Sequence, residues 1–131
     1  MLARVARWIP ALVYMTLIFY SSSQSDPAPA LTNHIWDKLL HGAGYGVLAL
    51  LYVWALAEER LAWTSMATLA VLLTSAYAAS DEFHQAFTPG RMPDVKDWLA
   101  DSVGAIIAVS AAAASTALRR PRPLQRSRPG R

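Results

Sequence analysis

Four long apolar stretches, separated by short polar segments, constrain the fold of this chain more than any other feature. The stretches cover residues about 4–23, 39–57, 61–80 and 98–118. A helix needs roughly 20 residues to cross the apolar core of a bilayer, and each stretch is close to that length. The helices of a soluble bundle would carry a charged stripe, whereas the interiors of these stretches carry no charged residue. The pattern predicts an all-α, polytopic membrane protein with four transmembrane helices in one bundle.

The composition excludes several other classes of protein. Apolar residue types make up 54% of the 131 residues and charged types 16%, whereas a soluble domain has about 25% charged residues. This balance excludes an intrinsically disordered chain. The lack of cysteine excludes a disulfide scaffold, a cysteine zinc site and a thiol nucleophile.

The first apolar stretch has a second interpretation, as a cleaved signal peptide. Arg4 and Arg7 precede the apolar run, and Ala28-Pro29-Ala30 resembles a small-residue cleavage site. That site lies far beyond the end of the apolar run, because a Ser- and Pro-rich segment intervenes. We therefore favour a membrane helix that begins near Leu2, with the two arginines reaching back to the interface.

Basic residues are divided unequally between the two sides of the expected bundle. With four spans, the N-terminus, the 58–60 turn and the C-terminal tail share one side, which holds nine of the twelve basic residues. The other side holds Lys38, Arg91 and Lys96. Because positively charged loops stay inside the cell, we expect both termini to be cytoplasmic and the two longer loops to face outward.

Residues 1–118 are expected to form the bundle, and residues 119–131 a basic, disordered cytoplasmic tail. Proline in this tail prevents a helix, and its arginines attract anionic lipid headgroups. No aromatic residue is interleaved with the arginines, which argues against a nucleic-acid partner. The expected partner is therefore membrane lipid.

Polar residues form three groups at the ends of the expected helices. Asp37, His41 and Tyr45 recur every four residues and share one helix face, and Asp97 and Asp101 do the same on the fourth stretch. The remaining group, Asp81 to Gln85, ends the third stretch. All three groups should meet at the outer end, where ionisable side chains are costly unless they pair or line a wet cavity. We therefore predict one outward pocket. Its candidate binding residues are Asp37, Lys38, His41, Tyr45, Asp81, Glu82, His84, Gln85, Arg91, Asp94, Asp97 and Asp101.

Small residues provide a way for these helices to approach closely. Gly42 and Gly46 on the second stretch, and Gly104 and Ala108 on the fourth, form small-xxx-small pairs.

Each polar group has a purely structural alternative when taken singly. Asp97, for example, has the position of a first-turn acid that stabilises a helix N-terminus.

The order of the polar motifs resembles the VanZ-like family of small bacterial membrane proteins over about residues 8–112. The motifs are Ser21 to Ser23, Asp37-Lys38-x-x-His41-x-x-x-Tyr45, Asp81-Glu82-x-His84-Gln85-x-Phe87-x-Pro89-Gly90-Arg91, and Asp94-x-x-Asp97-x-x-x-Asp101-x-x-Gly104. The resemblance implies a multi-pass protein of the bacterial cell (inner) membrane. The family's namesake is associated with resistance to the glycopeptide antibiotic teicoplanin, and the resemblance implies no catalytic mechanism.

Two classes of function follow. In the first, the pocket binds an anionic envelope lipid or cell-wall precursor, with Arg91 and Lys38 contacting its phosphate. In the second, the protein is an enzyme acting on such a lipid, with His41 or His84 as general base and Asp37 or Asp101 orienting it.

A proton-coupled carrier that uses Asp101 and His41 is a weaker third alternative, because the second and third stretches carry no charge at mid-membrane. The residue spacing permits a metal ion but demands none, so we assign no metal and no cofactor. We expect an acid of the third or fourth stretch to hold Arg91, with part of its guanidinium free for an anion.

Overall fold

The computed structural model describes residues 2–25 and 34–118. The regular elements of these ranges are α1 (Leu2–Ala6), α2 (Ile9–Ser22), α3 (His34–Leu56), α4 (Trp63–Gln85) and α5 (Val95–Leu118). The expected all-α class, with four long helices, is confirmed. The tail at 119–131 and the cleavage motif at 28–30 lie outside the described residues, so the expectations about them stay predictions.

The first apolar stretch is interrupted, contrary to the expected single helix over 4–23. α1 ends at Ala6 and α2 begins at Ile9, with Pro10 in its first turn. Proline has no N–H for the carbonyl four residues earlier, and its ring clashes there. The chain therefore makes a tight turn at Arg7 and Trp8, whose N–H groups bond to carbonyls three residues back.

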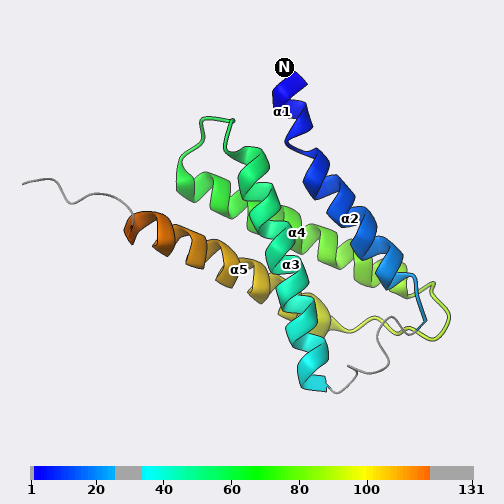
Figure 1. Cartoon of the computed structure of the whole chain (residues 1–131). Coiled ribbons are helices and arrows are strands. Elements are labelled where there is room, and N and C mark those ends of the chain that lie inside the picture. The colour runs from blue at the N-terminus through cyan, green and yellow to red at the C-terminus, as the bar shows by residue number, and fades with distance from the viewer. Residues whose placement is uncertain (1, 26–33, 119–131) are drawn as a thin grey trace, which may run out of the picture.

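α3 occupies the centre of the bundle. Figure 1 shows α2 and α5 on either side of it and α4 behind it. α3 packs most extensively on α5, then on α4, and makes fewer contacts with α2. Within the described residues, two helices are long and apolar enough to cross a membrane, over Asp37–Leu56 in α3 and Val95–Thr116 in α5. The structure thus supplies two of the four expected spans by length and composition, and the other two stay predictions.

Apolar side chains cover the outward faces of the long helices. A typical soluble monomer exposes only small apolar patches, and a large exposed apolar patch marks a surface that contacts a membrane or a partner. The exposed large side chains include Leu12, Val13 and Leu17 on α2, Val47 and Leu50 on α3, Leu72 and Leu73 on α4, and Val103, Ile106 and Ile107 on α5. This distribution is typical of helices that face lipid.

The closest helix contact uses the small residues that the sequence singled out. A Cβ added at Gly104 of α5 would overlap the carbonyl oxygen of Gly42 of α3. A Cβ at Gly46 would lie 3.2 Å from the Gly104 carbonyl oxygen and 3.3 Å from the Cβ of Ala108. The expectation that these glycines bring two helices together is confirmed.

The N-terminal arginines lie at the end of the bundle opposite the polar groups. Arg4 pairs with Glu59, and Arg7 Nη2 lies 2.9 Å from Glu58 Oε1 in the α3–α4 turn. The Arg7 guanidinium also stacks over the ring of Trp54 at 5.2 Å from its centroid. The N-terminus and the 58–60 turn therefore share one end, as the alternating direction of the expected helices predicts.

Candidate functional site

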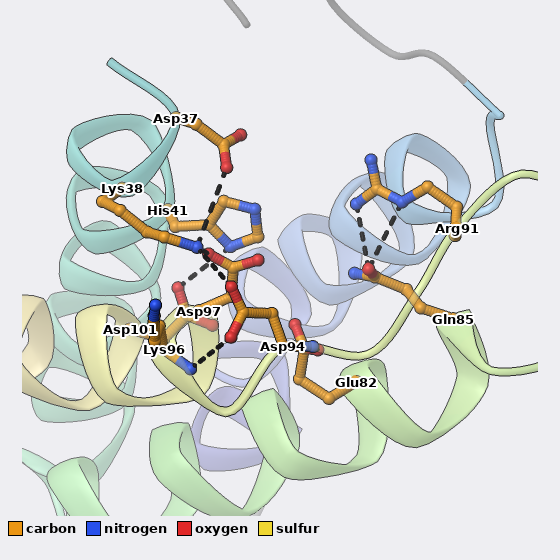
Figure 2. A network of polar contacts seen from close by, with 10 residues as sticks. All are labelled: Asp37, Lys38, His41, Glu82, Gln85, Arg91, Asp94, Lys96, Asp97 and Asp101. Carbon is orange, nitrogen blue, oxygen red and sulfur yellow. Dashed lines mark hydrogen bonds and ion pairs between the residues drawn. The ribbon is translucent and has the colours of Figure 1, made fainter. Parts of the chain in front are cut away.

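The other end of the bundle gathers polar side chains from α3, α4, α5 and the loop before α5. Figure 2 shows ten of them. The first turns of α3 and α5 and the last turn of α4 meet there, because α4 runs antiparallel to both of its neighbours. The predicted convergence of the three sequence groups at one end is thus present in the fold.

Lys38 of α3 is the centre of an ion-pair network with the start of α5. Its ammonium lies 3.0 Å from Asp94 Oδ2, pairs with Asp97, and lies 4.0 Å from Asp37 Oδ2. Asp97 also lies in the first turn of α5, where the helix dipole favours an acid. Lys38 is therefore engaged by carboxylates, and this placement removes the support for its expected role as a phosphate ligand.

Asp94 links this network to α4. Its Oδ1 accepts a hydrogen bond from the Lys96 backbone N–H at 2.8 Å, and its own N–H donates to Glu82 Oε2 at 2.7 Å. The Lys96 N–H first, and the Lys38 ammonium second, hold the pKa of Asp94 below its ordinary value. Burial raises the pKa of Glu82, and the bond from the Asp94 N–H offsets part of that rise.

His41 lies one turn deeper and faces α5. Its Nδ1 is 3.2 Å from Oδ1 of Asp101, a carboxylate that is almost completely buried. In the part of the chain that the structure describes, two groups of three side chains have ligand atoms within 4.8 Å of one another and could hold a metal ion. One group is Asp37, His41 and Asp97, and the other is His41, Glu82 and Asp101.

A cavity of about 340 Å³ lies beside this network, between α2, α3 and α4. Three polar atoms of residues that line it are buried without a hydrogen bond of ordinary geometry, namely Ser22 Oγ, Tyr45 Oη and Asp81 Oδ1, although the Tyr45 hydroxyl lies beside the Asp81 carboxylate. Its lining residues are Ile18, Ser21, Ser22, Asp37, Leu40, His41, Gly44, Tyr45, Asp81, Gln85 and Arg91.

Arg91 reaches the cavity from the loop between α4 and α5. Its Nε and Nη2 donate to Gln85 Oε1 at 3.3 and 3.0 Å, and Gln85 Nε2 donates to Asp81 Oδ2 at 3.2 Å. The expected direct acid partner is therefore replaced by an amide. Because a glutamine can accept at one end and donate at the other, Gln85 connects Arg91 to Asp81 without an ion pair.

His84 lies apart from this cavity. Its Nε2 is 3.0 Å from Ser23 Oγ, and its ring stacks on Phe19 of α2 with centroids 4.3 Å apart. The lining residues do not include His84, which joins α4 to the end of α2.

The structure therefore divides the twelve predicted binding residues into three sets. Those lining the cavity are Asp37, His41, Tyr45, Asp81, Gln85 and Arg91. Those in the adjoining network are Lys38, Glu82, Asp94, Asp97 and Asp101. His84 lies outside both sets. Sequence reasoning missed Ser22 as a lining residue, although its place in the serine run that ends the first stretch was a usable signal.

A family model described as VanZ/LLP1 matches residues 7–116, which is most of the chain. The chain belongs to the VanZ/LLP1 family. Proteins of the VanZ family are membrane proteins, in agreement with the two candidate spans. Comparison with curated proteins and with solved structures found no match.

Proposed function

We propose that this VanZ/LLP1 protein crosses the bacterial cell membrane four times and binds the headgroup of an anionic envelope lipid or cell-wall precursor at its outer end. The charge distribution supports this orientation, since nine of the twelve basic residues fall on the side of the two termini. Reporter fusions after residue 131 and at residues 58–60 should indicate cytoplasm. Fusions near residues 28 and 90 should indicate the exterior, and an exterior C-terminus would contradict the proposal.

One observation carries the binding proposal: a cavity whose lining combines an arginine with buried polar atoms that lack partners. Ser22 Oγ, Tyr45 Oη and Asp81 Oδ1 are such atoms. A buried polar atom without a hydrogen bond costs about 1–3 kcal/mol. A ligand with hydroxyl or amide groups would recover that cost, which favours a polar headgroup in this cavity.

Arg91 gives the cavity its affinity for phosphate in this proposal. Two of its nitrogens are committed to Gln85, which fixes the plane of the guanidinium. The remaining donors are suited to a phosphate oxygen, because a guanidinium presents five N–H groups in a rigid fork. The carboxylates of Asp37 and Asp81 would accept hydrogen bonds from the hydroxyl or amide groups of the same headgroup. This division of roles fits a lipid that carries both phosphate and sugar.

The test is a comparison of Arg91 variants. The purified full chain in detergent is titrated with dihexanoyl phosphatidylglycerol and with dihexanoyl phosphatidylcholine, and bound lipid is counted by native mass spectrometry. We expect preference for the glycerol headgroup, binding roughly tenfold weaker for Arg91→Lys, and weaker still for Arg91→Ala.

Lys96→Ala is the matched control, because it removes a basic charge at the same end outside the cavity lining. Equal loss in Lys96→Ala and Arg91→Ala, with no loss in Arg91→Lys, would show that only net charge matters. Susceptibility of cells to a teicoplanin-type antibiotic gives a second readout for the same variants.

The His41–Asp101 pair favours a second candidate function, an enzyme that acts on the same lipid. A buried carboxylate that holds an imidazole through Nδ1 is the arrangement of a general base and its orienting group. Conversion of the lipid by the purified protein, abolished in Asp101→Asn while lipid binding is kept, would favour the enzyme. Binding without conversion would favour the binding protein.

A further inference from the structure

Negative charge is concentrated and buried at the polar end. Asp101 is 1% exposed, Asp81 4% and Glu82 8%. Lys38 pairs with Asp94 and Asp97, and Arg91 bonds to Gln85 beside Asp81, so neither cation pairs directly with these three carboxylates. Within residues 2–25 and 34–118, no lysine or arginine pairs with Glu82 or Asp101. Buried carboxylates of this kind are costly unless a cation or a proton neutralises them.

Three side chains on three different helices meet where this charge is deepest. The ligand atoms of His41 on α3, Glu82 on α4 and Asp101 on α5 lie within 4.8 Å of one another. His41 Nδ1 and Asp101 Oδ1 are 3.2 Å apart. Two ligand atoms about 2.1 Å from one ion are about 3.0 Å apart at a right angle and about 3.4 Å apart at a tetrahedral angle. This hydrogen-bonded pair therefore also has the spacing of neighbouring ligands.

Glu82 supplies an independent indication. Its Oε1 is buried and has no hydrogen-bond partner, while Oε2 accepts the Asp94 N–H at 2.7 Å. A carboxylate held through one oxygen, with the other left for an ion, is the usual arrangement of a metal ligand and its supporting hydrogen bond. Burial also raises the pKa of Glu82, because a charged carboxylate is less favourable away from water.

We propose that His41, Glu82 and Asp101 bind one divalent cation of the Mn²⁺ or Zn²⁺ class. One imidazole and two carboxylates suit these ions, whereas Mg²⁺ and Ca²⁺ favour oxygen ligands alone. Three protein ligands leave coordination positions for water or for a ligand group, as in catalytic metal sites. Because His41 also lines the 340 Å³ cavity, the ion would lie in its wall.

The alternative group, Asp37, His41 and Asp97, is less suited to a cation. The Lys38 ammonium pairs with Asp97 and lies 4.0 Å from Asp37 Oδ2, so it already neutralises that group. A metal ion there would have to displace the ammonium or be repelled by it. The metal site formed by His41, Glu82 and Asp101 does not depend on the lipid-binding proposal, and each of the two proposals can fail without the other.

The experiment uses the full chain in detergent, without a polyhistidine tag, stripped with a chelator. It is incubated with Mn²⁺ or Zn²⁺ and desalted, and the bound metal is measured by mass spectrometry. We expect about one ion per chain, with at least tenfold weaker binding for Glu82→Gln and Asp101→Asn. Glu58→Gln makes the same charge change at the opposite end and should bind normally. Asp37→Asn should also keep the ion.

A measurement on the unaltered protein guards against variants that fail to fold. The spin-echo spectrum of bound Mn²⁺ should contain a nitrogen coupling from a histidine ligand, and it should disappear when EDTA removes the ion. An unaltered protein that retains no metal after desalting would overturn the proposal and leave protons as the neutralising charge. Loss of the ion in Asp37→Asn with retention in Glu82→Gln would overturn it as well, by assigning the ion to the other group.

Discussion

The two sides of α3 are packed in opposite ways. On one side, Gly42 and Gly46 let the backbone of α5 approach until a Cβ at Gly104 would find no room. On the other side, α2 makes few contacts, and a cavity of about 340 Å³ lies between it, α3 and α4. In the first interface the two backbones are in direct contact beside an apolar groove of about 700 Å³ that Gly42, Gly46 and Gly104 help to line. The second interface is held by scattered polar contacts around the more polar cavity.

This contrast separates a rigid frame from a region that can accommodate a ligand. Gly42 follows His41 in the sequence, and Ala100, whose carbonyl oxygen a Cβ at Gly42 would approach to 3.1 Å, precedes Asp101. The close α3–α5 interface therefore fixes the relative positions of the imidazole and the carboxylate. The α2 side contributes Ser22 and Ile18 to the cavity and packs less extensively on α3 than α5 does.

The largest expected effect comes from a methyl group in the close interface. Gly104→Ala places a Cβ against the Gly42 carbonyl oxygen, a backbone atom that cannot rotate away. Overpacking a core costs about 1–3 kcal/mol, and a clash with backbone lies at or above the upper end. We expect strongly reduced accumulation and a lower melting temperature in detergent.

Gly44→Ala is the control for this prediction. A Cβ at Gly44 would lie 3.8 Å from the Tyr14 hydroxyl, an ordinary contact, and alanine favours a helix over glycine by about 1 kcal/mol. Equal behaviour of the two variants would mean that α3 and α5 are not in close contact in the membrane.

The next effect concerns the ion pairs that link α3 to α5. Lys38→Met removes the ammonium and leaves the mostly buried Asp97 without its partner. An unpaired buried charge is costly, and because this pair keeps some solvent access we expect a loss of about 1–3 kcal/mol in unfolding free energy. Lys96→Met, which removes an exposed lysine on α5, should stay within about 0.5 kcal/mol. Denaturation followed by circular dichroism measures both variants. Similar losses in unfolding free energy would show that the Lys38 ion pairs contribute no more to stability than an exposed lysine does.

These two effects also show what could be predicted from the sequence. The glycine contact followed from small-xxx-small spacing, and the meeting of three polar groups followed from the alternating direction of the helices. Spacing along one helix is a local property, so it can be deduced without the fold. Which side chain pairs with which depends on helix crossing and loop course, which the spacing does not encode.

Lys38 and Arg91 illustrate that limit. Lys38 was expected to contact a phosphate, and Arg91 to be held by an acid with part of its guanidinium free, because the sequence does not show which partner a basic residue meets. The crossing of α3 over α5 gives Lys38 its carboxylates, and the turn after α4 brings Arg91 back to Gln85. The interruption at Arg7 and Trp8 was also missed, since the first apolar stretch was expected to be one helix that begins near Leu2.

A smaller effect is expected on the α2 side. The Tyr77 hydroxyl donates to the Met15 carbonyl oxygen at 2.6 Å and ties α4 to α2. Tyr77→Phe should cost about 1 kcal/mol, the usual value of one hydrogen bond, and should speed hydrogen exchange in α2 but not in α5. Tyr52→Phe loses only a bond to the Met15 thioether, a weak acceptor, and should change less. Faster exchange spread evenly over all helices would contradict the distinction between the two sides.

The smallest expected effect is a pH dependence at the rim of the close interface. The pKa of Asp94 lies below its ordinary value of 3.8, first because its carboxylate accepts the Lys96 N–H and second because Lys38 is beside it. A lowered folded pKa means that the carboxylate stabilises the fold above the ordinary pKa and that this contribution disappears as the pH falls through the folded value.

Asp94→Asn keeps an oxygen for the Lys96 N–H but loses the charge beside Lys38. The melting temperature of the unaltered protein should therefore exceed that of the variant near neutral pH, and the two should converge only as the pH falls below 3.8 and through the lower folded pKa. The difference should be small, and smaller in high salt, because this ion pair is partly exposed. A gap that persists unchanged under acid conditions would assign the effect of the substitution to altered hydrogen bonding at the start of α5 and not to the pairing with Lys38.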